Sequence, residues 1–196
     1  DQTSRIQWEV ITSGSTAGEH IKIKRAEEAA NRKIDDLGLN DNQIESIRAL
    51  RQQTAGVVLL SGTRNSGLTT TLYALLRNHD PFLYNINTLE KKSAGELQNI
   101  TQNIFTLSDT GTTTFSRRLQ SLLRRGPDIV GVGVCDEPQA AKLICAAAKD
   151  GRLVYVVLEA ESVNQTMEKW IKLVGDQALV SETLLCVINQ RLVRKL

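Results

Sequence analysis

The sequence has no apolar run close to the roughly 20 residues that a membrane-spanning helix requires, so the chain is not expected to cross a bilayer. Aromatic residues make up only 4% of the 196 positions, whereas 41% are apolar. A core with so few rings must rest on Val, Leu, Ile and Ala, which suits parallel strands covered by helices. The formal net charge is only +2, so neither nucleic acid nor an acidic membrane surface is indicated as a partner.

Cysteine is also scarce. Cys135, Cys145 and Cys186 are an odd set without the paired spacing of a zinc site or a disulfide framework, and each lies in an apolar stretch. They are predicted to be buried free thiols in a reducing compartment, and the cytoplasm is the expected location. The sequence starts at Asp1 without a Met or a signal-peptide pattern, which indicates a segment cut from a longer protein.

The first 55 residues are predicted to form part of a separate, smaller domain. Polar and apolar positions alternate at 5–11 and 20–24 around the turn-rich SGSTAG, which predicts a β-hairpin. A charged stretch at 27–36 has weak helical character. Asn40, with a Gln three positions later, predicts a capped helix, and we place a domain boundary after residue 55 because the following pattern differs.

From residue 56 onward, apolar runs alternate with helical segments. Strands are predicted at 57–60, 86–89, 129–134 and 153–158, and helices at 69–77, 114–125, 139–149, 163–173 and 180–195. Strands separated by helices predict an α/β fold, with a mostly parallel sheet and helices on both faces.

A phosphate-binding loop is predicted between the strand at 57–60 and the helix at 69–77. The pattern G-x-x-x-x-G-K-[S/T] is matched at Gly62, Gly67 and Thr69, but Leu68 stands in place of the lysine. Glycines let successive backbone N–H groups face an anion, and the helix N-terminus adds its positive dipole end. The Thr69 hydroxyl takes the place of a Mg²⁺ ligand, whereas the cation that reaches the terminal phosphates is missing. The candidate nucleotide-binding residues are Gly62, Thr63, Arg64, Asn65, Ser66, Gly67, Leu68, Thr69 and Thr70.

The continuation TTTLYALLR (69–77) resembles the motor ATPases of type II secretion and type IV pilus assembly, whose loop reads close to G-P-T-G-S-G-K-T-T-T-L-Y-A. Two later segments are also similar to that family. QSLLRRGPDI (120–129) resembles its R-A-L-L-R-Q-D-P-D-V segment, and NQRLVR (189–194) resembles its closing A-Q-R-L-V-R segment.

The resemblance implies a domain arrangement and a setting. Residues 1–55 would be the C-terminal part of the family's second N-terminal domain plus a linker helix, and 56–196 a RecA-like P-loop core. The family forms hexameric rings with nucleotide between subunits, which implies a homo-oligomer or an assembly with an active paralogue. Its place would be the cytoplasmic face of a secretion or pilus platform in the inner membrane, with no nucleic-acid partner.

The chain departs from the family at residues that carry charge. The family's acidic box E-D-P is EKK here (90–92), and its Walker B stretch V-G-E-I-R-D is VGVCDE here (132–137). Val134 thus stands where the family has glutamate, and Asp136 where it has arginine. In the histidine box L-S-T-L-H-T, Glu159 takes the place of the histidine.

Together these losses remove the charge pattern around a triphosphate. We therefore expect a degenerate ATPase domain, a structural or regulatory subunit with weak or no nucleotide binding and no significant hydrolysis. ATP and Mg²⁺ are its cofactors if binding is retained, with Thr69 as metal ligand. One alternative is a protein-binding module on the same fold, and another is an active motor with an altered site. The compensating residues for such a motor are Arg64, Glu90, Lys91, Lys92, Glu137, Arg191 and Arg194.

Several of these residues have simpler interpretations. Glu90 is either a metal-shell carboxylate or a leftover surface acid, and Glu137 replaces the lost glutamate only if the strand register shifts. Arg191 and Arg194, predicted on the last helix, either contact nucleotide or a neighbouring subunit, or are cations that suit the helix C-terminus.

Overall fold

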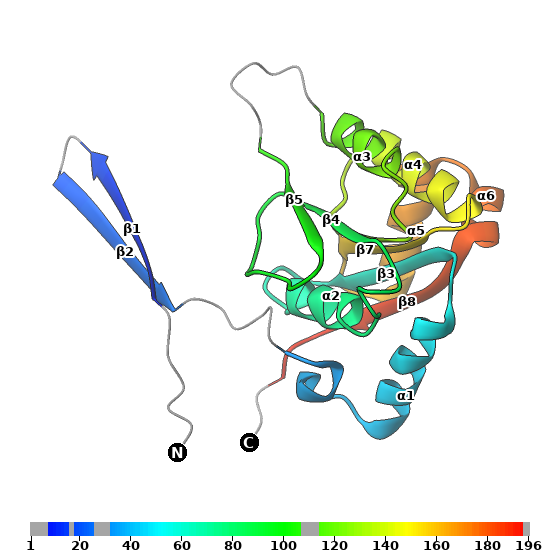
Figure 1. The fold of residues 1–196 in the computed structure, drawn as a ribbon, viewed down its shortest axis with the longest axis horizontal. Helices are drawn as coiled ribbons and strands as arrows, with labels where there is room; N and C mark the ends of the chain where they lie inside the picture. The colour runs from blue at the N-terminus through cyan, green and yellow to red at the C-terminus, as the bar shows by residue number, and fades with distance from the viewer. Residues whose placement is uncertain (1–7, 16–17, 26–31, 107–113, 194–196) are drawn as a thin grey trace.

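The structure, a computed structural model, describes residues 8–15, 18–25, 32–106 and 114–193 (Figure 1). In this part of the chain there are two sheets, of two and of six strands. The smaller sheet is the predicted hairpin, in which β1 (Trp8–Ser15) pairs antiparallel with β2 (Gly18–Arg25). Its strands extend further into the SGSTAG segment than predicted, because Ser15 pairs with Gly18.

Helix α1 (Asp41–Ala49) begins as predicted at Asn40. The Asn40 side chain accepts a hydrogen bond from Gln43 N (3.0 Å), and Gln43 Oε1 accepts one from Asn40 N (3.1 Å), so the capping box is complete. Two 3₁₀ turns flank the helix: η2 (Ile34–Leu37) and η3 (Leu50–Gln52). The first half of the helical stretch predicted at 27–36 lies outside the described residues, and in its second half the chain forms η2.

The large sheet is parallel throughout, with the strand order β5-β4-β6-β7-β3-β8. Its strands are β3 (Gly56–Gly62), β4 (Ile86–Glu90), β5 (Thr101–Ile104), β6 (Ile129–Val134), β7 (Leu153–Glu159) and β8 (Leu184–Gln190). The four predicted strands are confirmed as β3, β4, β6 and β7. At the end of β3, Gly62 lies in register with Glu159 of β7 and with Gln190 of β8.

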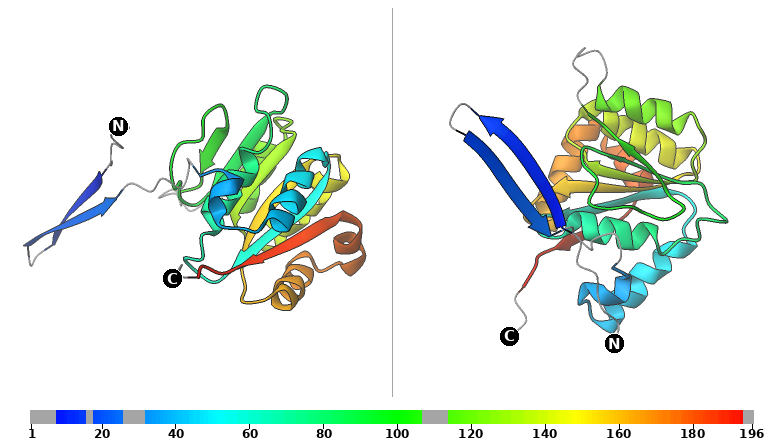
Figure 2. Two further views of the ribbon diagram at one scale, coloured as in Figure 1. Left: turned by 90° about the horizontal axis from the view of Figure 1, so that it is seen from below. Right: turned by 60° about the vertical axis from the view of Figure 1, so that its left-hand side comes forward.

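Helices cover both faces of this sheet, as predicted (Figure 2). They are α2 (Leu68–Leu76), α3 (Phe115–Leu123), α4 (Pro138–Lys149), α5 (Val163–Val174) and α6 (Gln177–Thr183). On one face, α3 to α6 pack on strand residues such as Val57 and Leu59. On the other face, α2 packs on Val58 and Leu60 together with residues of η2 and α1. The core is mainly aliphatic, as the composition predicts.

Two strands of the large sheet, β8 and β5, were not predicted. The prediction of a helix at 180–195 is wrong, because α6 ends at Thr183 and Leu184–Gln190 forms β8. The apolar spacing of this segment suits a helix and a half-buried strand alike, and its pairing with β3 is long-range, so a local pattern cannot reveal it. β5 was not predicted because its four residues, TQNI, have little apolar pattern.

The cysteines are free thiols, as predicted. Cys135 and Cys145 are buried, whereas Cys186, on the edge strand β8, is half-buried. Burial raises the pKa of the Cys135 thiol to about 12, so this group is not a reactive thiolate at neutral pH. In the described ranges, no helix combines the length and the apolar character that crossing a membrane requires.

Candidate phosphate-binding site

The chain between β3 and α2 forms the predicted strand–loop–helix at the carboxyl edge of the sheet. Ser66 N donates to the Thr63 carbonyl (3.1 Å), and Thr71 N donates to the Gly67 carbonyl (3.0 Å) as α2 begins. Asn65 and Gly67 both have left-handed backbone conformations, with φ of 64° and 84°. These conformations turn the chain sharply into the helix, whose N-terminal N–H groups form a site of positive potential.

Space as well as conformation restricts the two glycines of the motif. A Cβ on Gly62 would clash with Ser66 Oγ and lie 2.6 Å from the Gln190 carbonyl oxygen. A Cβ on Gly67 would lie 3.3 Å from Gln190 Nε2, at a φ that side chains disfavour. The loop is therefore wound tightly against the end of β8.

The residue at the lysine position of the motif points into the protein. Leu68, the first residue of α2, is 8% exposed and packs in the core. Thr69 and Thr70, which follow it, are half-buried. Ser66 is buried, and its hydroxyl has no hydrogen-bond partner among the described residues. The loop thus keeps its backbone amides and hydroxyl groups but has no ammonium group at this position.

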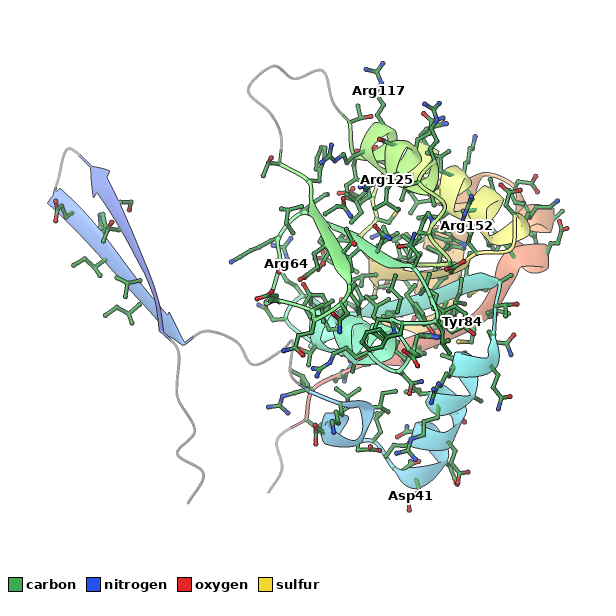
Figure 3. All side chains as sticks on the ribbon, viewed as in Figure 1. Asp41, Arg64, Tyr84, Arg117, Arg125 and Arg152 are labelled. Carbon is green, nitrogen blue, oxygen red and sulfur yellow. The ribbon has the colours of Figure 1, made fainter. Side chains whose placement is uncertain are left out.

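The cation that the loop does contain pairs with a carboxylate. Arg64 Nε lies 3.4 Å from Glu159 Oε1, and the Arg64 side chain, 81% exposed, extends outward from the loop (Figure 3). Glu159 is fixed beside the loop by β7, and the next backbone N–H, of Ala160, donates to the Gly62 carbonyl (3.1 Å). A negative charge therefore stands at the position where the resemblance places a histidine.

Glu90, at the end of β4, is buried with only 2% exposure, so its interpretation as a surface acid is wrong. The Tyr73 hydroxyl donates to Glu90 Oε2 (2.9 Å), and the Thr88 hydroxyl donates to Oε1 (2.9 Å). Burial raises the pKa of the Glu90 carboxyl and also that of the Tyr73 phenol. Both oxygens of the Glu90 carboxylate therefore accept hydrogen bonds from protein side chains. The role of Glu90 as a metal-shell ligand stays a prediction.

Lys91 forms an ion pair with Asp136, which lies outside the phosphate loop. Its Nζ lies 2.8 Å from Asp136 Oδ2, and the side chains are 47% and 55% exposed. The pair joins the segment after β4 to the segment after β6. Lys92 is exposed.

The end of β6 does not bring a carboxylate to the position of the lost glutamate. The register of β6 against β7 shifts between Val132 and Val134, and Val134 pairs with Val157. Glu137 lies beyond the strand, where its Oε2 accepts a hydrogen bond from Ser116 N (3.0 Å) in the first turn of α3. The compensating role of Glu137 stays a prediction, and its present contact is with α3.

The last strand contributes a residue that sequence reasoning missed. Gln190 Nε2 donates to the Ser66 carbonyl (2.7 Å), and Gln190 Oε1 accepts from the Thr71 hydroxyl (2.7 Å). The NQRLVR segment is the signal that could have found it, but the helix predicted there placed it wrongly. Arg191 is exposed just past β8 rather than on a helix, and Arg194 lies outside the described residues.

A metal centre formed by protein side chains is not found among the described residues. Within 8–15, 18–25, 32–106 and 114–193, no group of three or more His, Cys, Asp or Glu side chains is placed to hold a metal ion. A cavity of about 170 Å³ lies at the other end of β3, beside Gly56, Lys149 and Glu182. It contains none of the predicted site residues.

Comparison with known sequences identifies relatives over almost the whole chain. The sequence model of the family described as "Type II/IV secretion system protein" matches residues 2–196. The chain is 31% identical over 188 residues to the type II secretion system protein E of Klebsiella pneumoniae, and 30% identical over 188 residues to the type II secretion system ATPase E of Vibrio cholerae. Each alignment covers 95% of this chain but 37% of the relative, so the chain spans little more than a third of their length.

A comparison with solved structures supports the fold. The crystal structure of the pilus retraction motor PilT with bound ADP is similar with a TM-score of 0.70 and 21% sequence identity, covering 95% of this chain and 59% of that one. At this identity the likeness shows the fold alone. The predicted RecA-like P-loop fold is confirmed.

Proposed function

The chain belongs to the type II/IV secretion system protein family, and we propose that it is a degenerate member with a structural or regulatory role. Its phosphate loop binds nucleotide weakly or not at all and supports no significant hydrolysis. The single observation that supports this most is Leu68, which is buried where the motif has its lysine. Losing a charged partner at a buried phosphate contact costs on the order of 2–5 kcal/mol. Binding would be roughly thirtyfold to a few thousandfold weaker.

The side chains around the loop support the same conclusion. Glu159 places a carboxylate next to the loop, where it repels a phosphate, and it also holds Arg64 by an ion pair at 3.4 Å. Val134 removes the carboxylate at the end of β6 that would position a metal ion. Thr69 remains as a candidate metal ligand, whereas the Glu90 carboxylate already accepts hydrogen bonds from Tyr73 and Thr88. These residues do not fit a magnesium–triphosphate complex.

An active motor with an altered site is the second candidate, and one observation favours it. Arg64 is a cation within the loop itself, and an exposed ion pair to Glu159 holds it. In such a motor Arg64 would leave Glu159 and contact the phosphates. An Arg64→Ala variant would then lose both nucleotide binding and turnover, whereas a Lys91→Ala/Lys92→Ala variant would keep them. A loss in the lysine variant would show instead that Lys91 and Lys92 compensate for the missing lysine.

Titration calorimetry with Mg-ATP tests the main proposal. We expect no binding in the micromolar range for the wild-type protein. The variant Leu68→Lys/Val134→Glu/Glu159→His restores the family's side chains, and we expect it to gain affinity. Micromolar binding by the wild type would contradict the proposal.

The charge of Glu159 can be tested by itself in the same titration. Glu159→Gln should strengthen binding of Mg-ATP relative to the wild type, because it removes the repulsion without changing the size of the side chain. Glu161→Gln is the matched control, since Glu161 is an exposed acid two residues further along the chain. An equal gain in both variants would show that only net charge matters.

The assembly is a proposal as well, because the chain spans little more than a third of its relatives. We propose that the protein assembles with its own copies or with an active paralogue, at the cytoplasmic face of a secretion or pilus platform in the inner membrane. Sedimentation velocity of the full-length protein, alone and mixed with an active family member, tests this. We expect a ring-sized species in one of the two samples, and monomers in both would contradict it.

A further inference from the structure

Gln190 is the last residue of β8, and its side-chain amide contacts the chain on both sides of Leu68, in the phosphate loop and in α2. Nε2 donates to the Ser66 carbonyl before it, and Oε1 accepts from the Thr71 hydroxyl after it, both at 2.7 Å. One side chain therefore connects the loop, the first turn of α2 and the edge strand. We propose that Gln190 is a positioning residue that holds the loop in its anion-facing shape without any bound ligand.

The hydrogen bond to Ser66 determines the direction of the next amide. A trans peptide is planar, so the carbonyl of Ser66 and the N–H of Gly67 point in opposite directions. The described peptide bonds include no cis bond. Because Gln190 holds the Ser66 carbonyl toward β8, the Gly67 N–H is directed away from β8. The left-handed φ of 84° at Gly67 is what allows the chain to continue into α2 from this orientation.

The Ser66 carbonyl holds the amide of Gln190 in one orientation. A carbonyl oxygen only accepts hydrogen bonds, so Nε2 must face Ser66, and Oε1 is left to accept from the hydroxyl of Thr71, a residue 5% exposed. Replacing Gln190 by Glu would keep an acceptor for Thr71 but would place a second acceptor against the Ser66 carbonyl. The loop is thus sensitive to the identity of this side chain and not only to its volume.

The same contacts connect the loop to the chain that follows β8. Leu192 lies 3.6 Å from the position that a Cβ on Gly67 would take, and its side chain is 67% exposed. Residues after β8 therefore lie beside the loop at the point where Gln190 contacts it. The positioning role of Gln190 does not depend on whether the loop binds nucleotide, so it stands apart from the proposed function.

Amide hydrogen exchange, followed by mass spectrometry on the ligand-free full-length protein, tests the proposal. In Gln190→Ala we expect exchange in the peptide covering 65–71 to accelerate by roughly ten- to a hundredfold, since two hydrogen bonds are lost. Asn189→Ala is the matched control. Asn189 is the preceding amide of β8, and it bonds to Ser61 Oγ (3.0 Å) and the Ala160 carbonyl (3.3 Å) rather than to the loop.

A second variant separates positioning from general stability. Gln190→Glu keeps the shape and the Thr71 contact, so we expect it to fold like the wild type while exchange at 65–71 still accelerates. The protection of β4 (86–90) should be unchanged in this variant. The proposal is overturned if the loop exchanges as slowly in Gln190→Glu as in the wild type, or if Asn189→Ala accelerates it as much as Gln190→Ala does.

Discussion

The backbone frame of the loop, which consists of β3 and α2, is buried, whereas the charged side chains around the loop are exposed to solvent. All seven residues of β3 are buried, and α2 buries seven of its nine residues, so this frame is held by packing on both sides of the loop. The charged side chains at its rim are open to solvent: Arg64, Glu159, Lys91 and Asp136 are 81%, 38%, 47% and 55% exposed. The frame therefore depends on core packing, whereas the rim depends only on which charges are present.

This difference explains how one part can change while the other is kept. Most residues of the frame cannot change without a clash or a cavity in the core, and Leu68, which stands in place of the motif's lysine, is an apolar side chain that packs in this core. A residue of the rim can change if its partner changes with it. Lys91 and Asp136 illustrate this, because the resemblance places an acid and an arginine at these two positions, and here the signs are exchanged and the residues form an ion pair at 2.8 Å.

The largest expected effect comes from adding a methyl group to the frame. In Gly62→Ala the new Cβ meets the backbone carbonyl of Gln190 at 2.6 Å, and a backbone atom cannot move aside cheaply. We expect a loss of unfolding free energy of about 3 kcal/mol, the upper part of the range for overpacking. Urea denaturation measures it. Gly14→Ala is the control, since a Cβ there has no atom within 4 Å, and equal losses in both variants would contradict the tightness of the frame.

A pH dependence of the free energy of unfolding is expected from His79, which follows α2 and is 2% exposed. Its Nε2 is 2.7 Å from the Tyr155 hydroxyl, and its Nδ1 has no partner in the part of the chain that the structure describes. Burial, assisted by Arg51, lowers the pKa of His79 to about 4. The unfolded chain binds a proton here at higher pH than the folded chain does. Neutral His79 therefore contributes fully to the free energy of unfolding above pH ~6.5. This free energy decreases by about 2–3 kcal/mol as the pH falls toward 4.

Urea titrations between pH 7 and pH 4 test this for the wild type and for His79→Gln. We expect a steeper loss of unfolding free energy in the wild type, because only that chain takes up the extra proton on unfolding. Glu90 has a raised pKa, which makes the free energy of unfolding change with pH in the opposite direction. This change is the same in both proteins, so it cancels when their unfolding free energies are subtracted. Parallel curves would contradict the buried neutral state of His79.

A smaller loss is expected where the frame meets the acidic box. Tyr73→Phe removes a donor to Glu90 (2.9 Å) and an acceptor for Ala94 N (3.1 Å). We expect a loss of about 1–2 kcal/mol in unfolding free energy. Since the ionised Glu90 needs the donor most, the loss should grow as the pH rises through the Glu90 pKa. A loss that is constant with pH, measured by denaturation at pH 4 and 8, would exclude ionisation of Glu90 in this range.

The smallest effect is expected at the rim. Exposed ion pairs contribute below about 1 kcal/mol, so a double-mutant cycle of Lys91→Ala and Asp136→Ala should give a coupling energy under that value. The sign-reversed variant Lys91→Asp/Asp136→Arg should restore the wild-type stability to within the same margin. A coupling of several kcal/mol in thermal or urea unfolding would show that the rim supports the fold.

The sequence predicts the frame better than the rim, and the reason is physical. The strand–helix alternation and the capping box at Asn40 are local patterns, and both are confirmed. The helix predicted at 180–195 is wrong because the pairing of β8 with β3 is long-range, and that error hides Gln190 beside the loop. The surface-acid interpretation of Glu90 is wrong because a carboxylate in a sequence gives no sign of the Tyr73 hydroxyl that bonds to it in the core. Pairs such as Arg64 and Glu159 lie 95 residues apart and depend on the sheet register.

The central claim is that the frame persists without the charges needed for catalysis. Phosphate release from saturating Mg-ATP by the purified full-length protein tests it most directly, with Thr69→Ala as the comparison. The account predicts no release above the protein-free blank for either protein. Steady turnover by the wild type that Thr69→Ala abolishes would contradict it.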